Sequence, residues 1–366
     1  MRFYQGIHRF YCGIDLHGRT MHVCIVDQAG EVVADRNSAA NPEAFLKLIG
    51  PFRDGIVVGA ECMFAWYWLA DCCAEEGIAF VLGHALYMRL IHSAKAKNDR
   101  IDAGKIARLL RGGNFPPAYA YPEGMRETRD LLRRRMYLVH ERTALVTHVQ
   151  IVNTQYNLSP LGKNLGEAQQ LPRGKIAKRF AHASVQRNVA TDLELIEHLD
   201  RLLDELERYL VQTAKVDDAV TYARLQTVPG IGKVLGLVLL YEMHAHARFA
   251  TVGQFLSYAR LVRCAHESAG KKVGTGGKKI GNPYLKWAFG EAVCHFVRAN
   301  ERAKKWKQRY AQQHGKGKAL GVLAARLARA VYHMLRKGEA FDEARFWHNA
   351  AGSGKKAALA GRDVGA

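Results

Sequence analysis

Two aspartates spaced for one face of a helix, Asp99 and Asp102, are the residues best suited to chemistry. Residues i and i+3 of a helix face the same way, so both carboxylates would point toward one place. The basic residues beside them, which are candidate phosphate contacts, include Lys97, Arg100 and Lys105. Acids among cations suit a site where a divalent metal ion meets a phosphate. A capped, solvated first helical turn is the alternative interpretation.

Two further acids end apolar runs that are typical of buried strands. Asp15 ends an alternating run that begins at Phe10, and Glu61 ends the run 55–61. Ligands of such sheets gather at strand ends. Four converging carboxylates would hold two Mg²⁺ ions about 4 Å apart and activate a phosphodiester. Taken singly, Asp15 is also explained as a turn residue and Glu61 as a helix-capping acid.

A glycine- and lysine-rich segment, 265–282, carries one serine, Ser268. Glycine lets the backbone approach a ligand closely, and lysine neutralises phosphates. The hydroxyl of Ser268 could attack phosphorus where cations and a metal ion favour its alkoxide. A flexible DNA-contact loop in which Ser268 only donates a hydrogen bond explains the same residues. The lysines expected to contact nucleic acid are Lys271, Lys272, Lys278 and Lys279.

The elements that must position the four acids follow one another in a regular order. Strands are expected at 10–16, 21–27, 31–35, 55–61 and 78–82, and helices at 42–48, 64–76 and from about 99 to 110. The order β-β-β-α-β-α-β-α predicts an α/β mixed sheet with helices on its faces. It resembles the order of the ribonuclease-H-like, or RuvC-like, nuclease fold, in which the acids would stand at the functional edge.

A helical region follows the predicted sheet. Residues 123–157 form an arginine-rich helical stretch, and 191–215 repeat apolar residues at three- and four-residue intervals. The repeat is typical of a coiled-coil seam. It is formed by Ile196, Leu199, Leu203, Leu206 and Leu210. Two long helices returning on each other would form an arm, either as an isolated hairpin or as a dimerisation element.

The last third of the chain reads as helical. The turn Pro229-Gly230-Ile231-Gly232 before Lys233 resembles a helix-hairpin-helix turn, in which backbone N–H groups meet a phosphate. A tight turn between core helices is the alternative. Further helices are expected at 234–243, 250–258, 283–312 and 316–337, followed by a disordered basic tail, 346–366.

The charge of the chain favours a polyanionic partner. Lys and Arg number 54 against 34 Asp and Glu, for a net charge of +20. Nucleic acid is the first candidate and an acidic membrane surface the weaker one. No apolar run is long enough to span a bilayer, and no signal-peptide core is present. Seven scattered cysteines without a CxxC pair favour a reducing cytoplasm and disfavour a zinc site.

Several short motifs in one order resemble a known family across about residues 8–342. They are Gly13-Ile14-Asp15, Gly59-Ala60-Glu61, 97–103, 228–232, Ser268-Ala269-Gly270 and Gly281-Asn282. The chain resembles the DEDD transposases of insertion sequences that are guided by a structured bridge RNA. The resemblance implies a RuvC-like domain (8–122), a helical coiled-coil arm (123–217) and a mainly α-helical C-terminal transposase domain (218–345).

The resemblance also implies the chemistry. Asp15, Glu61, Asp99 and Asp102 would bind Mg²⁺, and Ser268 would join covalently to a DNA phosphate. A homo-oligomer, a dimer of dimers, would hold donor and target double-stranded DNA paired to loops of the bridge RNA. No membrane partner is implied, and the protein would act in the bacterial cytoplasm, associated with the nucleoid when bound to DNA.

Two other functions remain compatible with the residues. One is a metal-dependent, structure-specific DNA nuclease, such as a junction resolvase, whose C-terminal domain only binds DNA. The other is a nucleic-acid-binding protein without catalysis. Because the acids and Ser268 lie far apart along the chain, neither half makes a complete site, and we expect sites composed from different subunits.

Overall fold

The N-terminal acids stand on a five-stranded mixed sheet. The computed structural model describes residues 3–91, 98–162, 165, 173–262, 264–268, 271–276 and 280–348, and the chain divides into a unit of residues 1–123 and a unit of residues 124–366. The strand order in the first unit is β3-β2-β1-β4-β5, antiparallel from β3 to β1 and parallel from β1 to β5. The strands are β1 (Phe10–Leu16), β2 (Thr20–Asp27), β3 (Val32–Ala39), β4 (Ile56–Glu61) and β5 (Ala79–Gly83).

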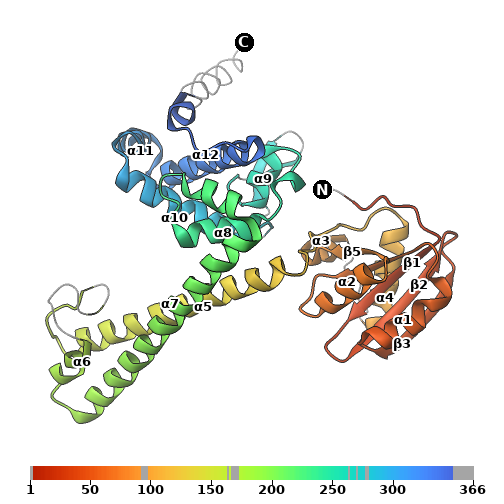
Figure 1. Cartoon of the computed structure of the whole chain (residues 1–366), viewed down its shortest axis with the longest axis horizontal. Coiled ribbons are helices and arrows are strands. Elements are labelled where there is room, and N and C mark those ends of the chain that lie inside the picture. The colour runs from red at the N-terminus through yellow and green to blue at the C-terminus, as the bar shows by residue number, and fades with distance from the viewer. Residues whose placement is uncertain are drawn as a thin grey trace. The chain divides into compact units, whose positions relative to one another are not determined.

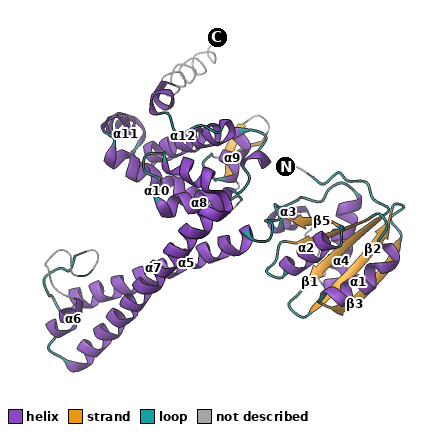
Figure 2. Ribbon diagram, in the orientation of Figure 1, coloured by secondary structure: helices purple, strands orange, loops and turns teal. Residues whose placement is uncertain are grey.

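Helices cover both faces of this sheet (Figures 1 and 2). One face packs on α1 (Pro42–Ile49) and α2 (Trp66–Glu75), through side chains such as Ile14, Phe45 and Leu69. The other face packs on α4 (Asp99–Arg111). Strand residues alternate between the two faces, as the two-residue period of a strand requires.

Two glycines let α4 lie directly on the sheet. A Cβ at Gly13 would stand 2.2 Å from the carbonyl oxygen of Ala103 and 2.3 Å from the backbone nitrogen of Ala107. A Cβ at Gly59 would stand 2.6 Å from Leu110 Cδ1. The approach of α4 to β1 is therefore limited by backbone atoms, and no side chain larger than hydrogen fits at position 13.

The predicted order of elements in the first unit is confirmed, with two differences. Strand β3 continues to Ala39 instead of ending at Asp35. Most of its residues are at least partly exposed at the edge of the sheet, so it lacks the apolar alternation that marks a buried strand. A short helix, α3 (Ala85–Ile91), was not expected.

Two long antiparallel helices, α5 (Met125–Gln155) and α7 (Ala183–Gln226), open the second unit, with short helical segments, α6 (Arg173–Ile176) and η2 (Ala177–Arg179), between them. Ion pairs join them in reversed order along the chain: Arg135 with Glu207, Arg142 with Asp200, and His148 with Asp192. The predicted seam residues Ile196, Leu203 and Leu210 are buried. This pairing is intramolecular, and dimerisation through a coiled coil stays a prediction.

Helix α7 changes direction at Asp218, whose backbone is extended (φ −158°, ψ 76°). The Asp218 carboxylate accepts a hydrogen bond from the backbone N–H of Thr221, at 2.9 Å, and so caps the short second segment. The adjacent Asp217 accepts a hydrogen bond of 2.6 Å from Tyr241 in the following helix. The kink is therefore fixed by two carboxylates.

A helical domain with a shared core completes the second unit (Figure 2). Its helices are α8 (Lys233–Met243), α9 (Val252–Tyr258), α10 (Pro283–Ala299), α11 (Glu301–His314) and α12 (Lys316–Lys337), with one short hairpin of β6 (Cys264–Ser268) and β7 (Lys271–Gly276). In the described residues, no helix is long and apolar enough to cross a membrane.

Three expectations for this domain are wrong. The segment 265–282 is not a loop throughout, because it contains the β6–β7 hairpin. The single helix expected at 283–312 is two, because Asn300 is extended and its side chain caps α11 through the Ala303 N–H. The tail does not begin at 346: Phe346 and Trp347 are 7% and 4% exposed and pack on Phe296. Residues 349–366 lie outside the described residues.

A buried ion cluster ties α5 to α8 and α10. Glu242 is 1% exposed and accepts hydrogen bonds from Arg129 (2.9 Å), Arg133 (2.6 and 3.0 Å) and Asn282 (2.7 Å). Burial alone would raise the pKa of Glu242, but these hydrogen bonds and the two guanidinium charges outweigh it, so the pKa lies below its ordinary value. Removing any one member of this cluster would leave a buried charge without its partner, which would destabilise the fold.

Replacing Gly13 by alanine tests the close approach of α4 to β1. The added methyl group must push α4 away, so the free energy of unfolding of the first unit should fall by about 3 kcal/mol or more. Urea denaturation measures it. The matched control is Gly50→Ala, because Gly50 has open space around it and a helical φ of −45°. Equal stability of Gly13→Ala and wild type would contradict the packing described.

Glu242→Gln tests the ion cluster and its pH dependence. Removing the charge should lower the free energy of unfolding of the second unit by about 3–5 kcal/mol at neutral pH. Because the folded-state pKa is depressed, the charge stabilises the fold above the ordinary value of 4.5 and this stability is lost as pH falls through the folded pKa. The difference between variant and wild type should therefore shrink in acid.

The control for Glu242→Gln is Glu197→Gln, which breaks an exposed i,i+4 pair with Arg201 and should change stability by less than about 0.5 kcal/mol. Denaturation curves recorded at several pH values give all these differences. A pH-independent loss in Glu242→Gln would show that the carboxylate charge is not what the two arginines require.

Candidate active site

The ends of β1 and α4 bring two of the predicted acids together. His17 Nε2 lies 3.4 Å from Asp15 Oδ2 and 3.5 Å from Asp99 Oδ1. One ligand atom from each of Asp15, His17 and Asp99 lies within 4.8 Å of the others. Two carboxylates at this spacing repel each other unless a cation stands between them, so the group could hold a metal ion.

Asp102 belongs to the same electrostatic neighbourhood. Burial is the main cause that raises the pKa of Asp15, and the negative charges of Asp99 and Asp102 raise it further, while the charge of His17 lowers it. The carboxylate of Asp102 receives an ion pair of 2.8 Å from Lys105, one turn along α4. The site therefore concentrates negative charge on a half-buried surface.

Glu61 stands at the end of the strand beside Asp15. Strands β1 and β4 are parallel, and their last pair is Ile14 with Ala60. Asp15 and Glu61 each follow that pair, so their side chains leave the sheet on the same face, the one that α4 covers. The backbone carbonyl of Glu61 accepts a hydrogen bond of 2.8 Å from Met63. All four predicted acids are thus placed on one face of the sheet, at one end.

The local sequence explains these positions. Asn98 caps α4 by accepting a hydrogen bond of 2.8 Å from the Ile101 N–H, which starts the helix at Asp99. Gly13 and Gly59 bring the helix against the two strands whose next outward residues on that face are Asp15 and Glu61. The acids are therefore positioned by backbone contacts and a cap.

His17 was not among the predicted site residues. The sequence carried one signal, its place two residues after Asp15, where it faces the same way as the acid if the strand geometry continues. A histidine between two carboxylates supplies a nitrogen ligand or, when protonated, a positive charge. Because the carboxylate oxygens are hard donors, the group as a whole fits a divalent cation that prefers oxygen.

The basic residues predicted around the acids have different partners. Arg100 donates a hydrogen bond of 2.6 Å to Asp35, which also contacts His22 at 2.6 Å. Lys105 pairs with Asp102. Lys97 lies outside the described residues. Arg100 remains exposed, so its pairing leaves room for a phosphate contact, and all three assignments stay predictions.

Ser268 lies at the tip of the short hairpin in the second unit. It is the last residue of β6 and pairs with Lys271, the first residue of β7. The register shifts between His266 and Glu267, which marks a bulge next to the tip. Lys272 lies in β7, while Lys278 and Lys279 lie outside the described residues.

The base of the hairpin is held from both sides. Arg260 donates hydrogen bonds to the carbonyls of Ile280 (3.1 Å) and Gly281 (2.8 Å). Gly281 adopts φ +95°, and a Cβ there would stand 2.5 Å from the Tyr258 carbonyl. Asn282 then caps α10 through the N–H groups of Tyr284 and Leu285, at 2.9 and 3.1 Å. Its amide also bonds Glu242, so the hairpin base joins the buried ion cluster.

The Pro-Gly-Ile-Gly turn joins α7 to α8. Gly230 adopts φ +90°, and a Cβ there would stand 2.2 Å from the Ala292 carbonyl of α10. This packing explains Gly230 without a phosphate. Gly232 has open space around it and precedes α8, which begins at Lys233 without a side-chain cap. A phosphate contact at Gly232 and Lys233 therefore stays a prediction.

Comparisons with known proteins cover most of the chain. A transposase family model for DEDD transposases of IS110 type matches residues 12–157, and the model described as "Transposase IS116/IS110/IS902 family" matches residues 222–310. The first match spans the four acids and the second spans Ser268.

Two curated relatives are similar over nearly their whole length. The transposase for insertion sequence element IS1111A of Coxiella burnetii is 23% identical over 336 residues, which are 90% of each chain. The transposase for insertion sequence element IS1328 of Yersinia enterocolitica is 23% identical over 351 residues, 90% of this chain and 98% of that one. The N-terminal sheet is accordingly the RNase H-like DEDD domain. This chain therefore carries the DEDD and C-terminal domains of the IS110 family of transposases, which are enzymes that cut and rejoin DNA.

Proposed function

We propose that this transposase is a Mg²⁺-dependent, site-specific DNA recombinase that is guided by a bridge RNA and forms a covalent phosphoserine–DNA intermediate through Ser268. One observation carries the proposal: Asp15 and Asp99, from elements far apart in sequence, meet within 4.8 Å around His17. Such an arrangement costs electrostatic free energy unless a cation is bound, so we infer that the acids serve a metal.

The proposed ligands are the four acids that share one end of the sheet. Their oxygen donors fit Mg²⁺, which prefers carboxylates and water. The bound ion would polarise a phosphoryl oxygen and stabilise the charge that develops in the transition state. Asp15 and Asp99 would hold the ion, and Glu61 and Asp102 would orient it or hold a second one.

The proposed role of Ser268 is that of the nucleophile. Its Oγ attacks the phosphorus of one phosphodiester, and the bond from phosphorus to one deoxyribose oxygen breaks. The serine proton passes to water, and the departing deoxyribose oxygen takes up a proton. In the second step a deoxyribose hydroxyl of the other DNA attacks the phosphoserine, and Ser268 regains its hydroxyl. No oxidant, reductant or nucleotide is consumed.

The proposed partners are donor and target DNA together with the bridge RNA. The net charge of +20 supports nucleic acid as the partner. Each phosphate that the protein neutralises releases counterions from the nucleic acid, and this release favours binding. The acids lie in the first unit and Ser268 in the second. A homo-oligomer, proposed as a dimer of dimers, could therefore assemble one site from the acids of one subunit and the serine of another.

A metal-dependent nuclease is the second candidate. The observation that favours it is that the acid group lies wholly within the first unit. A nuclease would activate water for the attack and would need Ser268 only for DNA contact, if at all. It would release a free phosphate end instead of a protein-linked one.

Trapping the covalent intermediate tests the proposal. Full-length protein is mixed with Mg²⁺, labelled donor DNA and RNA transcribed from the sequence that flanks the gene. We expect a denaturation-resistant protein–DNA adduct that mass spectrometry maps to Ser268. Ser268→Ala and Asp102→Asn should each reduce the amount of adduct by about 10³-fold or more, because the first removes the attacking hydroxyl and the second removes a carboxylate that positions the metal ion. Omitting the RNA should also abolish it.

The control for the trapping experiment is Ser257→Ala, which removes an exposed serine of α9 in the same domain. DNA cleavage by Ser268→Ala without any adduct would instead establish the nuclease. Mixing Asp102→Asn with Ser268→Ala protein should restore some strand exchange, since each supplies what the other lacks. Complete failure of such mixtures would exclude sites shared between subunits.

Binding of Mg²⁺ can be measured without DNA. A ligand that binds only the folded state stabilises it, by about 2.7 kcal/mol at 100 times Kd. Calorimetry should show that Mg²⁺ raises the Tm of wild type and not of Asp15→Asn or Asp99→Asn. Asp54→Asn, which removes a highly exposed carboxylate elsewhere in the first unit, should retain the shift. A shift of equal size in Asp15→Asn would place the metal elsewhere.

A further inference from the structure

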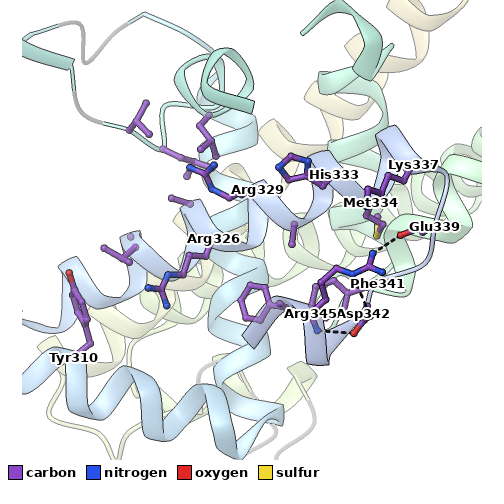
Figure 3. A pocket seen from close by; sticks show the side chains of 18 of the residues that line it. Tyr310, Arg326, Arg329, His333, Met334, Lys337, Glu339, Phe341, Asp342 and Arg345 are labelled. Atoms are coloured by element: carbon purple, nitrogen blue, oxygen red, sulfur yellow. Dashed lines mark hydrogen bonds and ion pairs between the residues drawn. The ribbon is translucent and has the colours of Figure 1, made fainter. Parts of the chain in front are cut away.

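We propose that a groove along α12 binds the sugar–phosphate backbone of the DNA strand that leads to Ser268. The groove, called here the α12 groove, is lined by residues of α12 between Gly317 and Lys337, by residues 339–342, 345 and 346, and by Leu256, Leu261, Val262 and Tyr310. Its volume is about 1110 Å³. Figure 3 shows the side chains that line it. The inference that the bound DNA strand leads toward Ser268 rests on the proposed role of Ser268.

One face of α12 lines the groove with cations. Lys318, Arg326, Arg329 and Lys337 all line it from this helix, together with His333. Because an α-helix rises 1.5 Å per residue, the stripe from Lys318 to Lys337 is about 28 Å long. A line of cations of this length matches a run of several phosphates better than it matches one small anion.

The acids in the groove do not neutralise this stripe. Among the described residues, the two acids that line it are Glu339 and Asp342, and both pair with Arg345, at 2.7 and 3.8 Å. Figure 3 shows these two contacts as dashed lines. Among the residues that the structure describes, Lys318, Arg329 and Lys337 form no ion pair. The stripe therefore keeps its positive charge.

The positive charges of the groove also affect the pKa of His333. Burial is the first cause that lowers the pKa of His333, and the charges of Arg329, Lys337 and Arg336 lower it further. Three positive groups around one imidazole describe a local positive potential that an anion would relieve. His333 lines the groove and lies between Arg329 and Lys337 (Figure 3).

Part of the lining of the groove is apolar. The apolar residues in it include Val322, Ala325, Ala330, Met334 and Phe346. Deoxyribose rings and base edges are apolar enough to lie on such a surface while the phosphates meet the cations on its rim. A strand of DNA uses both parts of the groove, whereas a free inorganic anion would use only the rim.

Two residues that line the groove come shortly before the β6–β7 hairpin along the chain. These are Leu261 and Val262, and β6 begins at Cys264. The backbone N–H of Leu261 is fixed by the carbonyl of Leu256, at 2.9 Å, so this part of the groove lining is anchored to α9. A strand lying in the groove would pass from α12 to the base of the hairpin that carries Ser268. This continuity is why we commit to DNA as the occupant.

The test compares two variants that remove the same charge from different places. Arg329→Gln/Lys337→Gln removes two cations of the α12 groove. Lys305→Gln/Arg309→Gln removes two exposed cations of α11 that do not line it. Calorimetry first shows that the Tm values of both variants equal that of the wild type. Each full-length protein is then titrated, at several salt concentrations, with a labelled DNA duplex that contains one end of the insertion sequence and its flanking DNA.

We expect the groove variant to bind the duplex about tenfold more weakly. The slope of log K against log salt should become less steep by about 2, since each phosphate contact contributes about 0.9. The α11 variant should lose less than twofold. Equal losses in the two variants would show that the net charge of the chain, and not the groove, binds the DNA, and would overturn the proposal.

Crosslinking identifies the occupant directly. A photoreactive residue in place of Val322, in the apolar part of the groove lining, should capture DNA when DNA and the flanking-region RNA are both present. Capture of the RNA alone, or of another copy of the protein, would overturn the proposal. Crosslinking to DNA in a protein that forms no adduct at Ser268 would support the groove while contradicting the proposed nucleophile, so the two proposals fail separately.

Discussion

The contact between the backbone of α4 and the backbone of β1 at Gly13 is the constraint on which the acid site depends. Because the contact uses main-chain atoms, the distance between helix and strand is set without any side chain that could adjust. Asp15 is two residues beyond Gly13 on the strand, and Asp99 is one turn before Ala103 on the helix. A shift of either element would separate the two carboxylates. The packing of α4 on the sheet therefore determines the geometry of the acid site.

The first unit was predictable because each of its elements carries a local signal. The buried strands are continuous apolar runs, Pro42 and Asn98 mark helix starts, and each acid lies at or near the end of an element. The sequence pattern could not predict the distances between the side chains of the site. That His17 lies between Asp15 and Asp99 depends on how far α4 slides along β1, and no single residue records that. The edge strand β3 was underestimated because an exposed edge needs no apolar alternation.

The second unit was predicted less well, for a different physical reason. Strand β7 is rich in glycine and lysine, and β6 contains alanine and glutamate. Because these residues have low β-propensity, the composition of the hairpin is a weak indication of strands. Asn300 ends a helix in the middle of a helical pattern because its side chain satisfies the next helix start. The cationic stripe of α12 was visible as a set of basic residues, but the groove beside it is also lined by residues 339–342, 345 and 346, and Phe346 was assigned to a disordered tail.

The bond from Asn282 to Glu242 has a consequence for engineering this protein. The domain boundary that the sequence suggests, between residues 217 and 218, leaves Arg129 and Arg133 on one side and Glu242 and Asn282 on the other. A chimaera joined at this boundary would take the two arginines from one homologue and the carboxylate from the other, so the ion cluster would combine residues from two different proteins. Grafting a foreign serine hairpin onto this scaffold thus requires moving the start of α5 along with it.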